Sequence, residues 1–316
     1  MPAAVLILAA VAVACVPAAS ALAAARWPRR SPAAAILLWQ AIGLGWGLAA
    51  IGALAGLGAD QRPGVVRGAY ALAYRLIAGR GVAAAGARSL PAAIRLLSLA
   101  TGAVLLLLLS GALLAASAAV LRARRRQRAL LTLLAHGDPK VPGALVVDHP
   151  AAAAYCVPGL RSAIVISAGT LDLLDQAELA AVLAHERAHL RERHDLVLLP
   201  FTALLQAFSW SVTARQAHAA VALLVEMLAD DQALRHRPVA ARELATALIR
   251  VGAAGGGRAP LGSLAVSDHG ADGQVAARVS RLLRPAPRLP WPAIAMVCAV
   301  AVLVVTVPAA FLLFPS

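Results

Sequence analysis

The feature that most limits how this chain can fold is a set of four long apolar stretches. They cover about residues 3–25, 33–58, 96–121 and 291–314. Each is long enough to cross a bilayer, for which about 20 apolar residues are needed. The chain of 316 residues is 61% hydrophobic with a mean hydropathy of +0.77, which is too apolar for an ordinary soluble domain. The pattern predicts a membrane protein with four spans.

The first apolar stretch also has features of a secretory signal peptide, because the segments 18–20 and 23–25 resemble cleavage sites. Against that alternative, no basic residue precedes the apolar run, and the run is longer than a signal peptide needs. A membrane span is therefore the favoured interpretation.

Arginines gather next to the predicted spans. They lie in the loop 26–30, in the segment 122–128 after the third span, and in the segment 278–288 before the fourth. Four spans put all three clusters on one side, which the positive-inside rule assigns to the cytoplasm. We therefore expect a multi-pass protein of the plasma membrane with both termini outside. The loop 59–95 also carries six arginines and argues against this orientation.

The formal net charge of +14 would suit nucleic-acid binding. However, the chain has no basic patch interleaved with aromatic residues and no recognition motif. Arginines attracted to anionic lipid explain most of the excess charge. We therefore expect the lipid bilayer as a partner and no direct contact with nucleic acid.

Residues 185–189 read His-Glu-Arg-Ala-His, which is the pattern HExxH. The preceding run 175–184 has an acidic start and a helix-forming composition. On a helix, His185 and His189 share a face and can bind one metal ion together. Glu186 can then act as general base on the attacking water, as in metalloproteases. A pair of surface histidines on a charged helix is the alternative.

A hydrolytic zinc site usually has three protein ligands, and two acidic residues after the motif are candidates for the third. Asp195 has the spacing of one known pattern, but Glu192 replaces the glycine that turns the chain in that pattern. Glu226 stands in an otherwise apolar helical stretch, where a carboxylate without a partner would cost several kcal/mol. We predict Glu226 as the ligand, with an arginine ion pair as the alternative. Asp230, one turn later, can accept a hydrogen bond from a ligating histidine.

HExxH followed by a Glu-x-x-x-Asp helix resembles the gluzincin pattern of two groups of membrane peptidases. One is the HtpX and CAAX-prenyl-protease group, and the other is the BlaR/MecR group of antirepressor peptidases. The chain is more similar to the second group. The segments 154–159, 164–169 and 179–194 look like its peptidase core, and 277–283 looks like its closing segment. The resemblance covers roughly residues 90–315.

The resemblance implies Zn²⁺ as the cofactor and assigns roles to five residues. They are the metal ligands His185, His189 and Glu226, the catalytic general base Glu186, and Asp230 as hydrogen-bond support for a ligating histidine.

The chain departs from the BlaR/MecR group in two places. Many relatives have Asp nine residues after the first histidine, where this chain has His194 followed by Asp195. We therefore give neither of these residues a catalytic role. The sequence also ends at Ser316 without the extracellular penicillin-binding sensor, so direct sensing of β-lactams is not carried over.

We expect a mainly α protein, in which four transmembrane helices carry a gluzincin-like α+β zinc protease domain inserted between the third and fourth spans. The predicted boundaries are 1–126 for the membrane region, 127–288 for the metallopeptidase domain and 289–316 for the fourth span. Short strands are expected at 144–147, 153–157 and 164–167, with a turn at 136–139. The apolar stretch 196–210 is too short to span, so we expect a core or membrane-surface helix.

Charged residues crowd the segment 187–195. Each would cost at least about 2.5–3.5 kcal/mol in the middle of a bilayer. We therefore expect the site outside the hydrocarbon core, near its cytoplasmic face. His269 and Arg278 are candidates for stabilising the oxyanion.

The leading hypothesis is a membrane-embedded zinc-dependent endopeptidase that acts on a protein or peptide substrate. The resemblance suggests regulatory proteolysis, of a cytoplasmic transcriptional repressor or of the protein itself. One alternative is an HtpX-like quality-control protease, which would give many cleavage products rather than one. Another is a non-catalytic membrane signalling or scaffold protein that keeps the motif as structure.

Overall fold

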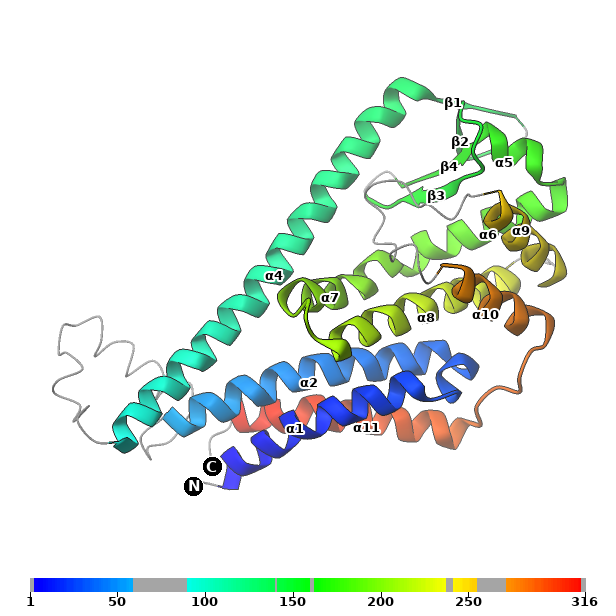
Figure 1. Cartoon of the computed structure of the whole chain (residues 1–316). Helices are drawn as coiled ribbons and strands as arrows, with labels where there is room; N and C mark the ends of the chain where they lie inside the picture. The colour runs from blue at the N-terminus through cyan, green and yellow to red at the C-terminus, as the bar shows by residue number, and fades with distance from the viewer. Residues whose placement is uncertain are drawn as a thin grey trace.

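The computed structural model describes residues 3–58, 90–139, 141–159, 162–236, 241–254 and 271–313, and most of them are helical (Figure 1). Four helices are long and apolar enough to cross a membrane. They are α1 (Ala3–Ala24), α2 (Pro32–Gly58), α4 (Leu90–Leu134) and α11 (Trp291–Leu313). These helices suggest a membrane protein, and each covers nearly all of one of the four apolar stretches found in the sequence.

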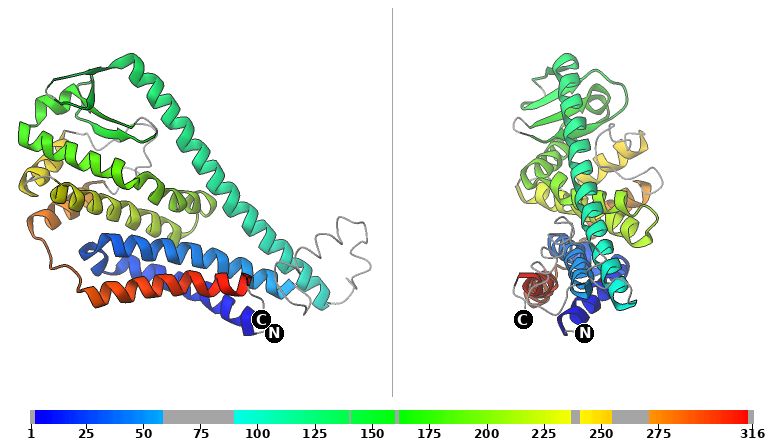
Figure 2. Two further views of the ribbon diagram at one scale, coloured as in Figure 1. Left: turned by 180° about the vertical axis from the view of Figure 1, so that it is seen from behind. Right: turned by 90° about the vertical axis from the view of Figure 1, so that its left-hand side faces the viewer.

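Helices α1, α2 and α11 lie side by side as a bundle, with the two chain ends at the same end of it (Figures 1 and 2). The contact between α2 and α11 depends on Gly45. A Cβ atom there would lie 2.5 Å from the carbonyl oxygen of Val304. Glycine therefore lets the two backbones approach closely, as small residues do in membrane helix pairs.

Helix α4 begins against the end of α2 and then leaves the bundle at an angle to reach the sheet (Figure 1). It remains helical to Leu134, well past the end of the predicted span at residue 121. No glycine or proline interrupts residues 122–134, so the arginine-rich segment continues the same helix.

The short 3₁₀ helix η1 (Trp27–Arg30) joins α1 to α2. The Arg30 Nε donates to the carbonyl oxygen of Pro287 at 2.8 Å, and the Arg281 Nε donates to the carbonyl oxygen of Arg29 at 2.7 Å. The arginine clusters 26–30 and 278–288 therefore lie at the same end of the bundle.

A four-stranded sheet follows α4, in the order β1-β2-β4-β3. Its strands are β1 (Ala135–Gly137), β2 (Ala144–Val147), β3 (Ala154–Val157) and β4 (Ala163–Ser167). The central pair β2–β4 is parallel, and both outer pairs are antiparallel. The structure confirms the three predicted strands. The predicted turn at 136–139 is wrong in part, because His136 and Gly137 pair with β2.

Between the sheet and α11, the described residues form six helices. They are α5 (Ala168–Leu173), α6 (Gln176–Glu192), α7 (His194–Ala207), α8 (Val212–His236), α9 (Ala241–Ala253) and α10 (Ala271–Leu283). Helix α7 coincides with the apolar stretch that the sequence indicated as too short to span.

Helix α6 has well-defined ends. At its start, the Asp175 side chain accepts from the Glu178 backbone N–H, and the Glu178 side chain accepts from the Asp175 backbone N–H, which forms a capping box. At its end, Arg193 adopts the left-handed conformation with φ 51°. The chain therefore turns into α7 without a glycine.

Two apolar cores hold α6 and α8 in place. In the first, Ile164 and Ile166 of β4 pack with Val182 and Leu183 of α6. In the second, residues of α7 and α8 pack on α1 and α2, including Trp39, Phe201, Val221, Leu224 and Val225. The helix that carries Glu226 is thus attached directly to the predicted membrane bundle.

Candidate metal centre

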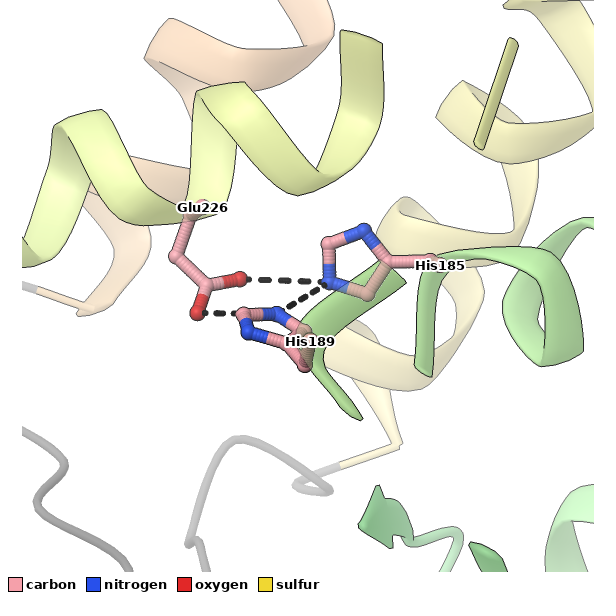
Figure 3. Close-up of side chains that lie close together, drawn as sticks. All are labelled: His185, His189 and Glu226. Atoms are coloured by element: carbon pink, nitrogen blue, oxygen red, sulfur yellow. Dashed lines mark hydrogen bonds and ion pairs between the residues drawn. The ribbon is translucent and has the colours of Figure 1, made fainter. Parts of the chain in front are cut away.

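Three side chains from two helices converge at the centre of the domain: His185 and His189 from α6, and Glu226 from α8 (Figure 3). The two Nε2 atoms are 3.0 Å apart. The Glu226 carboxylate lies 3.4 Å from the His185 Nε2 and 3.5 Å from the His189 Nε2. The structure therefore brings together the three residues predicted as metal ligands.

Local structure explains why these side chains meet. The two histidines are four residues apart on α6, so they share one face of that helix. Leu179, Val182 and Leu183, earlier on the same helix, pack into the core beneath the sheet. Helix α8 packs against α6, and this contact places Glu226 opposite the histidines.

The donor set fits a zinc ion. Zinc binds histidine nitrogen and carboxylate oxygen at about 2.0–2.2 Å, so two ligands at tetrahedral positions lie about 3.3 Å apart. The observed separations of 3.0, 3.4 and 3.5 Å are close to that value. His185, His189 and Glu226 would hold the ion and leave a fourth position for water or substrate.

Asp230 lies beside the first histidine of the motif. Its Oδ1 is 3.0 Å from the Nδ1 of His185, so His185 directs one ring nitrogen to the candidate metal position and the other to a carboxylate. Burial opposes ionisation of Asp230, but Arg278 and His185 together lower its pKa to about 2. The carboxylate is therefore charged and can fix the tautomer of His185.

Arg278 of α10 joins two of the acidic groups. Its Nε and a terminal nitrogen donate to Asp230 at 2.9 and 2.7 Å, and its other terminal nitrogen lies 2.9 Å from Glu226. Arg278 and Asp230 are both buried. The arginine ion pair considered as the alternative for Glu226 thus exists beside its histidine contacts.

This arrangement bears on the two candidates for oxyanion stabilisation. The guanidinium of Arg278 is engaged by the carboxylates of Asp230 and Glu226, so its main role is to compensate their charge. His269, the other candidate, lies outside the described residues.

Glu186 lies next to the first histidine on α6. Burial raises the pKa of its carboxyl group, and the neighbouring His189 and His185 oppose this effect. Burial raises the pKa of the Cys156 thiol of β3, and the charge of Glu186 and a hydrogen bond to it raise that pKa further. Strand β3 therefore lies beside the predicted general base.

His194 is a site residue that the sequence did not reveal. It is buried, its Nδ1 is 3.0 Å from the Nδ1 of His189, and its ring meets that of His189 edge to face. Burial, together with the neighbouring His189, lowers the pKa of His194 to about 3. A neutral His194 can accept the hydrogen on the His189 Nδ1, which leaves the His189 Nε2 free to bind a metal.

Asp195 has a structural role, which agrees with the sequence-based conclusion that it is a poor candidate for a metal ligand. It forms an ion pair with Arg124 of α4 and is not part of the group formed by His185, His189 and Glu226. Arg193 lies 3.6 Å from its other oxygen. The ion pair with Arg124 ties the start of α7 to α4.

Comparison with known proteins gives one match, and it falls on this part of the chain. No curated protein and no solved structure matches the sequence. The family model described as Peptidase family M48 matches residues 120–236. The matched segment begins within α4, ends with α8, and contains all three candidate ligands, whereas Arg278 lies beyond it. Residues 120–236 thus match peptidase family M48, which supports a zinc metallopeptidase of membrane type.

Proposed function

We propose that this protein is a membrane-embedded zinc-dependent endopeptidase with Glu186 as its general base. One observation carries the proposal, which is the convergence of His185, His189 and Glu226 from two helices within a segment that matches a peptidase family. The non-catalytic alternative is less favoured, because the supporting residues Asp230 and His194 are also in place around the histidines.

The chemistry is hydrolysis of a peptide bond. A bound zinc ion would polarise the scissile carbonyl and acidify the attacking water. Glu186 accepts a proton from that water as its oxygen adds to the carbonyl carbon, and later donates it to the leaving amine. The raised pKa of Glu186 suits both steps, since it brings the carboxyl group closer to neutral pH.

The edge of the sheet provides a site for an extended substrate. In the sheet order β1-β2-β4-β3, strand β3 is an edge, and its Cys156 lies beside Glu186. A peptide that paired with β3 through main-chain hydrogen bonds would bring its carbonyl groups to the candidate metal centre. Specificity would then come from side chains on either side of β3.

We further propose that the domain faces the cytoplasm of the plasma membrane and acts in regulatory proteolysis. The two arginine clusters bound together at one end of the bundle support the orientation. The similarity to BlaR/MecR peptidases supports a cytoplasmic transcriptional repressor as substrate.

The test compares cells that carry the wild type with cells that carry Glu186→Gln, by mass spectrometry of newly formed peptide ends. The amide keeps the shape of the side chain but cannot accept the proton, so we expect zinc content to be unchanged and cleavage to be lost. One defined product would support regulatory proteolysis, and many products would support the quality-control alternative. Full cleavage by Glu186→Gln would rule out the assigned role of Glu186.

A further inference from the structure

Helix α7 starts at the level where the third predicted span ends. The ion pair between Arg124 and Asp195 joins the first turn of α7 to α4. Arg124 follows directly after the apolar run of α4, which ends near residue 121. The start of α7 therefore lies at the boundary between the apolar and charged parts of the molecule.

From this boundary, α7 runs along α2 toward the middle of that helix (Figures 1 and 2). The Gln40 side chain donates to the carbonyl oxygen of Val197 at 2.8 Å. Farther along, the ring of Phe208 meets Trp46 of α2 edge to face, with centroids 5.7 Å apart. Trp46 lies about four turns, or roughly 21 Å, from the first residue of α2. Helix α8 then returns along the same path to Glu226.

The turn between α7 and α8, residues 208–212, is here named the hairpin tip. Trp210 is 78% exposed and Val212 is 58% exposed. Because the tip belongs to a hairpin that lies along a predicted span, lipid acyl chains could cover these two side chains. Leu44 of α2, two residues before the Trp46 that meets Phe208, is also exposed and belongs to a predicted span. The contact of Trp46 with Phe208 therefore places the tip next to an apolar, exposed part of α2.

Several backbone groups at the hairpin tip have partners within the protein, which a lipid environment favours. The Phe208 N–H donates to Leu204 and the Ser211 N–H donates to Phe208, at 2.9 and 2.8 Å. The Ser211 hydroxyl accepts from the Ala214 N–H. The nearest charged residue along the chain, Arg215, donates to the carbonyl oxygen of Ser209 at 2.7 Å, and its long side chain can extend toward the lipid headgroups.

We propose that the hairpin tip is inserted into the hydrocarbon of the bilayer beside α2. The α7–α8 hairpin is then a re-entrant element, and the candidate metal centre at its open end lies at the membrane surface. The exposed side chains of Trp210 and Val212 then contact the acyl chains of the lipids. This inference goes beyond the peptidase proposal, because it concerns where the domain sits and requires no catalysis.

Fluorescence quenching tests the proposal in the full chain reconstituted into phosphatidylcholine vesicles. The emission of Trp210 is obtained as the difference between Glu186→Gln protein and the same protein with Trp210→Phe. We expect vesicles made of lipids brominated on the acyl chain to remove most of this emission. Aqueous acrylamide should have little effect on it.

A matched control places a tryptophan of similar exposure outside the bilayer. Leu133, near the end of α4, is 81% exposed, so Leu133→Trp in the Trp210→Phe background should be quenched by acrylamide and unaffected by brominated lipid. Quenching of Trp210 by acrylamide alone would put the tip in water. Quenching by neither agent would mean that another protein copy covers it. Either result overturns the proposal and leaves the peptidase proposal intact.

Discussion

At the residue scale, the candidate metal centre combines side chains that the sequence could identify with others that it could not. His185, His189 and Glu226 were predictable because helical spacing and an unusual carboxylate among apolar residues both indicate metal binding. The position of His194 beside His189 was not predictable. Its position depends on the left-handed turn at Arg193. Glycine is the usual sequence signal for a left-handed residue, and this turn has none.

Replacing His194 tests its role in orienting His189. His194→Ala removes the acceptor for the His189 Nδ1 hydrogen, and loss of such a partner typically weakens metal binding about 10- to 100-fold. Competition with a zinc chelator measures the change. His194→Asn keeps an acceptor and should retain most of the affinity. The exposed histidine His136 provides the control, because His136→Ala should change nothing.

Arg278 compensates buried negative charge, and its removal should be costly. Arg278→Ala leaves the buried Asp230 carboxylate without its main partner, so we expect a loss of about 3–5 kcal/mol in unfolding free energy. Urea unfolding in detergent, followed by tryptophan fluorescence, measures this loss. Arg281 on the same helix pairs with the more exposed Asp231, and Arg281→Ala should cost no more than about 1 kcal/mol. Equal losses for the two variants would contradict this account.

At the scale of single elements, the ends of α6 decide where its histidines point. The acidic start predicted from the sequence is a capping box formed by Asp175 and Glu178. The end was harder to predict, because the charged run 187–195 has good helix formers and no breaker. The ion pair of Asp195 with Arg124 is a tertiary contact that fixes α7 in its new direction.

The left-handed residue Arg193 gives a prediction for this junction. An L-residue in that conformation costs roughly 1–2 kcal/mol, and glycine avoids the cost. Arg193→Gly should therefore be tolerated with unchanged zinc affinity, whereas the β-branched Arg193→Val should destabilise the protein. The unfolding temperatures of the wild type, Arg193→Gly and Arg193→Val measure their order of stability. A more stable valine variant would mean that the chain does not turn at this residue.

At the scale of the whole molecule, composition and periodicity predicted four apolar helices and a small sheet between the third and fourth. They did not predict how these parts pack. The sequence predicted that the helix 196–210 is either a core element or a membrane-surface element. The quenching experiment decides between these two alternatives. Its packing along α2 depends on contacts such as Trp46 with Phe208, which are distant in the sequence.

The close packing of α2 and α11 gives a prediction for the bundle. Gly45→Ala places a methyl group against the Val304 carbonyl, so the helices must separate and the unfolding temperature should fall. Gly47→Ala is the matched control. The same methyl group there meets only Leu109 at 3.7 Å, which is ordinary contact, so this variant should be as stable as the wild type or slightly more stable. An equal fall in the unfolding temperature of both variants would argue against the α2–α11 contact.

The most direct test of the account is the zinc content of purified variants after dialysis against a weak chelator, measured by mass spectrometry. The wild type, Glu186→Gln and Asp231→Ala should each keep one zinc ion per chain, because none of these changes removes a proposed ligand. His185→Ala and Glu226→Ala should lose it, since each leaves two of three ligands. Undiminished zinc in Glu226→Ala would contradict the account, because the ion would then not lie between α6 and α8.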